Sequence, residues 1–322
     1  MALTGHFEKR LQLGQESAYG SIGVTRRTVP FQSETFSLDI PNTPVADVWG
    51  NRTPRKGWQG PRVSTPSIDF DVAPELGVGD VLKCLFGTSS ASQFGTFTSY
   101  KHTFTVRAVA EPATMFARLL EYGTFVYDYN GLAVDALDLN YPAKGNVHAS
   151  AKFLGKDRIA GTAFTGTYGT LAPFTPFGNL SVLIDGTASP DVRDVKVGFK
   201  NNAAQHVMAG TNNTPSKATV GMLEASGEFV LYLQNETELN KFINKTSSTL
   251  QLNLQGTTFS LSGTSKYEMN LKFPNIEYRA FPIQNQDGVI AAGVAWNAYF
   301  GTNAVGTAAV IAELIDSVAS YD

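Results

Sequence analysis

Short segments in which apolar and polar residues alternate recur along this chain of 322 residues. A period of two sends successive side chains to opposite faces, which is the pattern of a β-strand with one buried face. Gly, Pro and Asn separate the segments and favour the turns that strands require. The pattern predicts a mainly β fold of sandwich or barrel domains, and its clearest examples are His102–Val106, Phe125–Tyr129, Val147–Phe153, Leu250–Leu254 and Tyr267–Phe273.

Three Asn-Gly or Asp-Gly pairs lie between such segments. Asn, Asp and Gly tolerate the positive φ angles that a two-residue hairpin turn needs. We therefore expect hairpins at Asn130-Gly131, Asp185-Gly186 and Asp287-Gly288.

A few segments have helical spacing instead. Pro74–Phe86 has apolar residues at roughly helical intervals and ends before Gly87. Asn235–Asn244 begins with an Asn cap and early glutamates, both of which favour a helix N-terminus. A third, weaker pattern covers Ala308–Val318. We expect two or three short helices beside the strands.

The length of the chain exceeds what one hydrophobic core usually supports, so two domains are expected. The pattern Val-x-x-aliphatic-x-aliphatic-x-aromatic occurs in Val134–Tyr141 and again in Val192–Phe199, and a strand, a short helix and a second strand also occur twice. A stretch rich in Gly, Thr and Pro, residues 161–178, predicts a linker. The expected divisions are an N-terminal arm and long loop over 1–60, a first β-domain with its linker over 61–176, a second β-domain over 177–301 and a C-terminal tail over 302–322.

Two other irregular stretches, residues 41–66 and 201–225, each precede a strand and a short helix, as one would expect of the same loop in two copies. Loops of this length in a compact domain are uncommon and usually functional. The aromatic content of 11% extends into loops and linker, which predicts apolar surface that subunit interfaces would bury. The first loop holds the residue types that anchor protein interfaces: Trp49, Arg52, Arg55, Lys56 and Trp58.

The charge composition argues against a general nucleic-acid binder. The formal net charge is −3, whereas such binding rests on Lys and Arg that neutralise phosphates. The single cysteine, Cys84, lies in an apolar segment and is expected to be buried. No apolar run reaches membrane-spanning length and no secretion signal opens the sequence, so we expect cytoplasmic synthesis and no membrane anchor.

Residues for catalysis or metal binding are few and scattered. The four histidines lack metal-ligand spacing, so we expect no catalytic site, no metal and no other cofactor; they are His6, His102, His148 and His206. Asp69 and Asp71 share one face of a predicted strand, which would suit a divalent cation or an acid–base pair, although a solvated face is the simpler interpretation. Asp135 and Asp138 form a second pair.

The N-terminal region carries the most recognisable motifs. Leu11–Gly20 contains Gly-x-Glu-x-x-x-Gly, and Thr28–Glu34 ends in Pro-x-x-Ser-Glu. Both resemble the beginning of tail tube (major tail) proteins of siphovirus-type, long-tailed viruses. Val134–Tyr141, Phe153–Gly155 and Asp191–Asn202 resemble strands and an Asn-Asn turn of the larger members. The resemblance extends over about residues 8 to 300 and implies tandem β-sandwich domains.

The resemblance further implies a virion structural protein that is made in the host cytoplasm and is not an enzyme. In such proteins the inner sheets of neighbouring subunits join into a barrel, and a long loop reaches the next ring, so the loop over 41–66 becomes the expected ring-stacking loop. Acidic residues become candidates for the lumen, where negative charge would let viral DNA slide without specific binding: Asp135, Asp138 and Asp194, with Asp128 and Glu268.

The implied partners are further copies of the chain and other tail proteins: the tape measure, the terminator and the distal tail protein. If the chain holds two copies of a domain of which a ring usually contains six, three chains would close a ring with pseudo-sixfold symmetry. A single large domain would instead need six chains. The alternatives are another virion component, such as a capsid decoration or tail terminator protein, and a carbohydrate-binding or glycosidase β-sandwich that uses Asp69 and Asp71.

Overall fold

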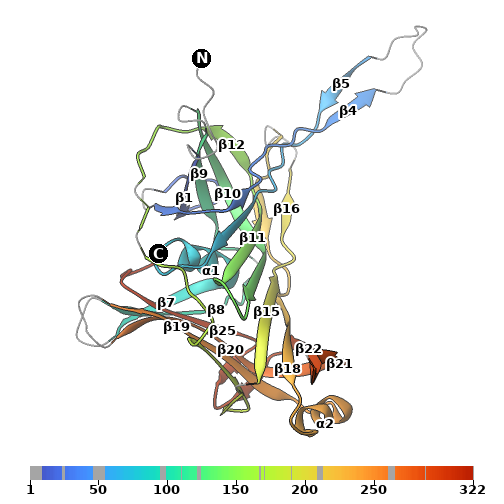
Figure 1. Cartoon of the computed structure of the whole chain (residues 1–322). Coiled ribbons are helices and arrows are strands. Elements are labelled where there is room, and N and C mark those ends of the chain that lie inside the picture. Colours follow the sequence, from blue (N-terminus) through green and yellow to red (C-terminus); the bar gives the residue numbers. More distant parts are fainter. Residues whose placement is uncertain are drawn as a thin grey trace.

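The computed structural model describes residues 9–23, 26–45, 55–94, 99–109, 111–121, 125–166, 168–169, 171–189, 191–208, 213–259, 265–286 and 288–321. Over these residues the fold is mainly β, as the sequence predicts, with antiparallel sheets and two short helices (Figure 1). Four of the five strand segments predicted from alternation lie within strands, and the fifth, Val147–Phe153, begins one residue before its strand.

The first half of the chain forms two sheets that share one long strand, β10 (Phe125–Tyr141). The first part of β10 pairs with β9 and β12, and its second part pairs with β11. One sheet has the order β2 (Arg27–Val29), β1 (Arg10–Gln15), β9 (Met115–Glu121), β10 and β12 (Asp157–Ala160). The other has the order β3 (Ser33–Glu34), β6 (Ser67–Asp71), β11 (His148–Leu154) and β10.

The second half repeats this order of pairing around another long strand, β20 (Lys266–Ala280). One sheet has the order β14 (Thr187–Ala188), β13 (Leu180–Ile184), β19 (Ser248–Thr258), β20 and β25 (Ile311–Asp316). The other has the order β15 (Val192–Lys200), β18 (Glu224–Tyr232), β22 (Val289–Ala298) and β20, which β21 (Ile283–Gln286) continues along β22. Strands of the predicted N-terminal arm and C-terminal tail thus lie inside the sheets.

The two halves meet where β10 pairs with β15. Leu137 lies opposite Phe199 and Tyr141 opposite Val195. This pairing joins the strands β3, β6, β11, β10, β15, β18, β22 and β21 into one continuous sheet, which we call the central sheet. The two segments with a similar sequence pattern, Val134–Tyr141 and Val192–Phe199, are therefore pairing partners, and the pairing order matches β10 with β20 instead. Neighbouring strands in one sheet share the same alternation, which explains the similarity.

Four hairpins extend from the sheets: β4 (Asn42–Val45) with β5 (Arg55–Gln59), β16 (Ala204–His206) with β17 (Lys217–Thr219), β7 (Gly87–Gln93) with β8 (Tyr100–Val106), and β23 (Gly301–Asn303) with β24 (Gly306–Ala308). The first two fall in the long loops over 41–66 and 201–225, and β4 and β5 project far from the body (Figure 1). Strand β8 also pairs with β25 and so ties the first half to the second.

Helix α1 (Val78–Phe86) is shorter than the predicted Pro74–Phe86, because Glu75 and Gly77 have positive φ angles that an α-helix cannot contain. Its apolar face is buried, and Gly87 ends it with a left-handed φ of 84°. Helix α2 (Thr237–Asn244) begins two residues after the predicted start: Glu236 is its N-cap and makes no side-chain cap bond, while Asn235 before it accepts the Thr237 N–H at 2.9 Å. Leu239 and Phe242 pack on the core, whereas Ile243 is exposed.

Two local predictions are wrong. Asn130-Gly131 does not form a hairpin: β10 runs through it, and the positive φ of Gly131 serves a β-bulge between Tyr129 and Leu132. The predicted helix over Ala308–Val318 is instead β25, which pairs with β20 and β8 on its two edges and is largely buried. Burial of both faces removes the alternation by which a strand would be recognised. The Asp185-Gly186 and Asp287-Gly288 turns are confirmed by the pairing of their flanking strands, although Asp287 itself lies outside the described residues.

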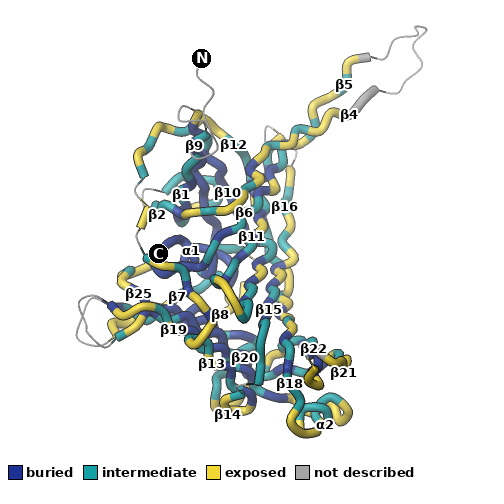
Figure 2. The backbone as a smooth tube through the Cα atoms, viewed as in Figure 1, coloured by how far each residue is buried: buried dark blue, intermediate teal, exposed yellow. Residues whose placement is uncertain are grey.

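The hydrophobic core runs through both halves without a break. Apolar residues on the inner faces of the sheets form one cluster, in which Phe199 and Trp296 both pack against Phe273. Figure 2 shows buried residues along the middle of the sheets, with exposed residues on the hairpins and along α2. The stretch over 161–178 has no helix or strand in its described part, and its Phe174 is buried in the core.

Candidate functional site

The solvent-facing side of the central sheet is a polar surface built from regular strands. On β10, Leu137, Leu139 and Tyr141 are buried, while Asp138 is exposed and Asn140 half-buried, as alternation predicts. On β15, Lys196 and Lys200 occupy the same side. The exposed side of the sheet therefore carries alternating polar side chains while its other side closes the core.

This surface has mixed charge. A hollow of about 350 Å³ lies over it and is lined by Asp138, Lys196, Glu228 and Arg279, among others. Lys196 Nζ donates to Glu228 Oε1 at 2.6 Å, and both side chains are more than half exposed. Asp138 thus lies near cations as well as anions. In the described part of this sheet the face has mixed charge, and is not purely acidic as the sequence suggests.

The other predicted lumen residues have local bonds. Asp135 Oδ1 accepts the Ala203 N–H at 2.9 Å. Asp194, in a left-handed conformation with φ 51°, accepts the Ala143 N–H at 2.8 Å and bridges to Arg193 at 2.7 Å. Burial raises the pKa of Asp194, but the Ala143 and Arg193 bonds outweigh burial and lower it below the ordinary value.

Two of the acidic residues named with them lie elsewhere. Asp128 is buried in the first part of β10, where Arg118 donates to both carboxylate oxygens at 2.5 and 2.6 Å. It cannot line a lumen, because its partner covers it inside the sheet. Glu268 lies in the part of β20 that pairs with β19 and β25, outside the central sheet. Alternation alone could not separate these positions, because each long strand serves two sheets.

The predicted ring-stacking loop forms the projecting hairpin of β4 and β5, which we call the arm. Trp58 lies opposite Thr43 and is 75% exposed. Lys56 is exposed beside it, and Arg55 begins β5. Trp49 and Arg52 lie outside the described residues. A Trp side chain this exposed is the type of anchor that partner surfaces bury.

Asp69 and Asp71 share one face of β6, as predicted. Hydrogen bonds from Ser150 and then Ser33 lower the pKa of Asp69, which disfavours the protonated form that a general acid needs. Asp71 accepts bonds from Gln32 and Asn146, each at 2.8 Å. Both carboxylates therefore bind side chains of neighbouring strands and loops.

Glu16, the acidic residue of the Gly-x-Glu-x-x-x-Gly motif, was not singled out from the sequence. Its carboxylate accepts the N–H of Gly20 at 2.9 Å, the N–H of Gly131 at 2.7 Å and the Thr114 hydroxyl at 2.7 Å. Burial raises the pKa of Glu16 to about 7, although these bonds and Lys156 act in the opposite direction. The motif therefore fastens the loop after β1 to the bulge in β10.

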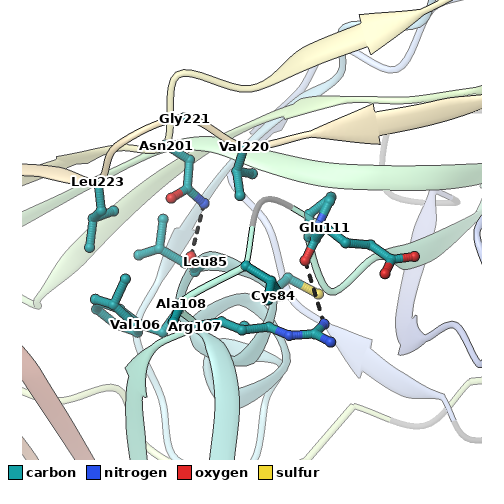
Figure 3. Close-up of a pocket in the computed structure, with 14 residues that line it drawn as sticks. Cys84, Leu85, Val106, Arg107, Ala108, Glu111, Asn201, Val220, Gly221 and Leu223 are labelled. Carbon is teal, nitrogen blue, oxygen red and sulfur yellow. Dashed lines mark hydrogen bonds between the residues drawn. The ribbon is translucent and has the colours of Figure 1, made fainter.

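Figure 3 shows a cavity of about 230 Å³ at the end of α1. Asn201 closes one side, and its side chain donates to the carbonyls of Leu85 at 2.8 Å and Val134 at 3.0 Å. Cys84 is buried as expected, and burial raises the pKa of its thiol well above the ordinary value. The thiolate is the nucleophilic form of cysteine, so a thiol that seldom ionises is a poor nucleophile. The Cys84 Sγ donates a hydrogen bond to Gln15 Oε1 at 3.3 Å.

In the described part of the chain no three His, Cys, Asp or Glu side chains gather in a way that could hold a metal ion. His102 is buried in β8, where its Nε2 lies 2.7 Å from the carbonyl oxygen of Val318, as a structural histidine would. None of the helices within the described part of the chain is long and apolar enough to span a membrane.

Comparison with known proteins identifies the family. No curated protein matched the chain. A sequence model described as "Phage tail tube protein" matches residues 7–298, which is most of the chain and agrees with the resemblance of its N-terminal motifs. Proteins of this family are structural components of the virion tail, and the fold and the polar central sheet agree with such a role. This chain belongs to the phage tail tube protein family.

Proposed function

We propose that this chain forms rings that stack into the hollow tube of a long, siphovirus-type viral tail, through which viral DNA passes during ejection. The family match over residues 7–298 is the observation that carries the proposal. The central sheet supports it, because within the described part of the chain β3 pairs only with β6 and β21 only with β22, which leaves the outer edge of each unpaired. Unpaired edges are templates for pairing with another chain.

The proposal includes two β-domains in each chain, joined by the linker over 161–178. The supporting observation is the order of strand pairing, which is the same around β10 and around β20. If the chain is divided according to which strands pair with one another, the first domain covers residues 9–160 and the second covers residues 180–316. A ring would then contain three chains with pseudo-sixfold symmetry, and covalent linkage would favour closure by making every second domain contact intramolecular.

The arm is the proposed contact between stacked rings. Its supporting features are its projection from the body (Figure 1), the exposure of Trp58 and the basic Lys56 beside it. Trp49, Arg52 and Arg55 would extend the same contact. The hairpin of β16 and β17 follows β15 as the arm follows β3, so the second domain would present a shorter counterpart in the same direction.

The exposed side of the central sheet is the proposed lumen. Asp138 and the exposed bonding partners Lys196 and Glu228 lie on it, while Asp135 and Asp194 would border it through their turns. On this surface Lys196 is paired with Glu228, and mixed charge of this kind attracts phosphates less than a purely basic patch would. Viral DNA would therefore slide along it without specific binding.

Within the virion the tube would also meet the tape measure inside it, the terminator at one end and the distal tail protein at the other. The protein would be made in the host cytoplasm before tail assembly. Another structural role, such as tail terminator, is the remaining alternative, because a terminator of similar fold would form a ring that does not stack.

Electron microscopy of the purified chain in negative stain tests the proposal. Hollow tubes or stacked rings are expected as the concentration rises. Single rings that never stack would favour the terminator alternative. Monomers at every concentration would contradict self-assembly of this chain.

A further inference from the structure

The junction between the two halves provides a template for contacts between chains. At this junction β10 pairs with β15, with Leu139 opposite Val197 and Asn140 opposite Lys196. The remaining edges of the central sheet are the far edge of β3 and that of β21, and no strand of the described ranges covers either. If the two halves are equivalent, the open edges of β21 and β3 are of the same kind as the edges of β10 and β15, which pair with each other.

The equivalence of β10 with β20 and β21 holds residue by residue. Register shifts occur between Tyr129 and Leu132 in β10, and at the same spacing between Phe273 and Ile276 in β20. A second register shift follows at the same distance along each strand. It lies between Val134 and Ala136 where β10 pairs with β11, and between Tyr278 and Ala280 where β20 pairs with β22. Two independent bulges at matching positions fix the alignment.

The same alignment continues into β21. In the first half Ala149 of β11 lies opposite Leu139 on one side and Phe70 on the other. In the second half Ala292 of β22 lies opposite Ile283 and Leu231. Ile283 of β21 is therefore the counterpart of Leu139, and Gln284 is the counterpart of Asn140.

The segment after β3 is the counterpart of β15. Asp69 of β6 pairs with Ser33, as its counterpart Val230 of β18 pairs with Arg193. Two residues back along β6, the carbonyl of Ser67 accepts the N–H of Thr35 at 3.0 Å.

In the second half, Lys196 lies opposite Glu228 of β18, which is the counterpart of Ser67. Thr35 therefore corresponds to Lys196, and Phe36 to Val197. Both Phe36 and Val197 are buried, whereas Thr35 and Lys196 are exposed, as one strand pattern in two copies requires.

From this equivalence, and resting on the ring proposed above, we infer that β21 of one chain pairs in antiparallel register with residues 33–39 of a second copy. Ile283 would lie opposite Phe36 of the next copy, and Gln284 opposite its Thr35. The contact would continue the central sheet from chain to chain in the register of β10 with β15.

Backbone orientation at both edges agrees with this register. The carbonyl of Pro282 faces β22, where it accepts the Gly293 N–H at 3.1 Å, so Ile283 next to it directs its backbone groups to the open edge. Pro282, which has no N–H, therefore removes no donor from the seam. On the other edge the N–H groups of Thr35 and Asp39 bond inward, to the carbonyls of Ser67 and Val63. The N–H of Phe36, between them, bonds to neither of these strands, while its carbonyl accepts the buried Tyr129 hydroxyl at 3.1 Å and keeps a second lone pair.

Two features of the isolated chain show what the contact would replace. Ile283 is 52% exposed, whereas its counterpart Leu139 is 1% exposed beside β15. The Phe36 N–H is bonded at 2.8 Å to the carboxylate of Glu34, two residues before it. A second copy would cover the Ile283 side chain and offer the Phe36 N–H a backbone carbonyl in place of its own local partner.

Disulfide formation between engineered cysteines tests the register. Thr35 and Gln284 are exposed, and both direct their backbone bonds away from the seam, so they would form a non-hydrogen-bonded pair about 4.5 Å apart at Cα. That separation suits a disulfide. Assembled Thr35→Cys/Gln284→Cys protein, mildly oxidised, should run on a denaturing gel as covalent dimers and closed rings, and a mixture of the two single variants should give dimers alone.

The matched control is Thr35→Cys/Asn285→Cys, because a shift of one residue turns the second cysteine to the other face of the sheet. It should assemble and stay uncrosslinked. Tubes of the Thr35→Cys/Gln284→Cys protein that do not crosslink would overturn the seam and leave the tube proposal intact, whereas failure of the unaltered chain to assemble would defeat the tube proposal itself.

A second variant covers the case in which the cysteines disturb assembly. Ile283→Asp places a charge in the seam and should abolish rings while the monomer melts at the same temperature as the unaltered chain. Ile283→Val should assemble normally. Rings formed equally well by the Ile283→Asp protein would overturn the inference.

Discussion

The carboxylate of Glu16 accepts the backbone N–H of Gly131 at 2.7 Å, across a separation of more than a hundred residues in the chain. Gly131 lies at the bulge where β10 changes its pairing partners, with a positive φ of 62°. A side chain at the end of β1 therefore stabilises the bend of the strand that both sheets of the first half share.

This relationship predicts a pH dependence. Because burial raises the pKa of Glu16 to about 7 from an ordinary 4.5, the folded chain keeps a proton that the unfolded chain releases between these values. The free energy of unfolding should then fall as pH rises through this window, with the contribution complete below about 4.5 and lost above about 7. Glu16→Gln should remove this pH-dependent change in the free energy of unfolding, which amounts to about 3 kcal/mol across the window. Chemical denaturation at several pH values measures it, and Glu111→Gln, at an exposed carboxylate, should keep the original slope. Identical slopes for Glu16→Gln and the unaltered chain would contradict the assignment.

The buried pair of Arg118 and Asp128 should be sensitive to the loss of one partner. Asp128→Asn leaves the guanidinium uncompensated and should cost about 3–5 kcal/mol. Glu228→Gln, which breaks the exposed pair with Lys196, should cost under about 1 kcal/mol. Thermal melting of the two variants should rank them in this order, and equal melting temperatures would contradict the difference in burial.

The arm should be dispensable for folding and required for stacking. Replacement of residues 48–58 with a short Gly/Ser linker should leave the melting temperature of the subunit nearly unchanged, because Trp58 and Lys56 are exposed. Rings should still close but tubes should not form. Trp58→Ala should shorten tubes through loss of one anchor. Tubes of normal length from the loop replacement, seen by electron microscopy, would refute the stacking role.

Asp138→Lys tests the lumen. The new lysine would lie near Lys196 and Arg279 and create a basic cluster that binds phosphates. Tails should assemble and release DNA more slowly, while Asp138→Asn should release it nearly as fast as the unaltered chain. DNA release from triggered virions measures the rate. A reconstruction with Asp138 on the outer surface would refute the assignment.

Much of the fold follows from the sequence. Alternation identifies the half-buried strands, and Asp185-Gly186 identifies a turn, because these signals are local. Asn130-Gly131 has the same local chemistry but serves a bulge, since the pairing of β10 with distant strands decides whether the chain reverses. The largely buried β25 lacks alternation.

The surfaces could be predicted only in part. Exposure of Trp58 and Asp138 follows from loop and strand patterns. The burial of Asp128 depends on Arg118 of a neighbouring strand, and the bonds of Glu16 depend on Gly131, so neither is visible within one segment. The equivalence of β10 with β20 could not be predicted from the sequence, because it is visible in the positions of the bulges and the order of strand pairing and not in the residue identities.

The number of chains in a ring distinguishes two β-domains per chain from one. A reconstruction of the assembled tube by cryo-electron microscopy would measure it. We predict three chains per ring, each contributing two β-domains that superpose through β10 and β20, with β21 of each chain beside residues 33–39 of the next. Six chains per ring, each contributing a single domain to the inner barrel, would contradict it.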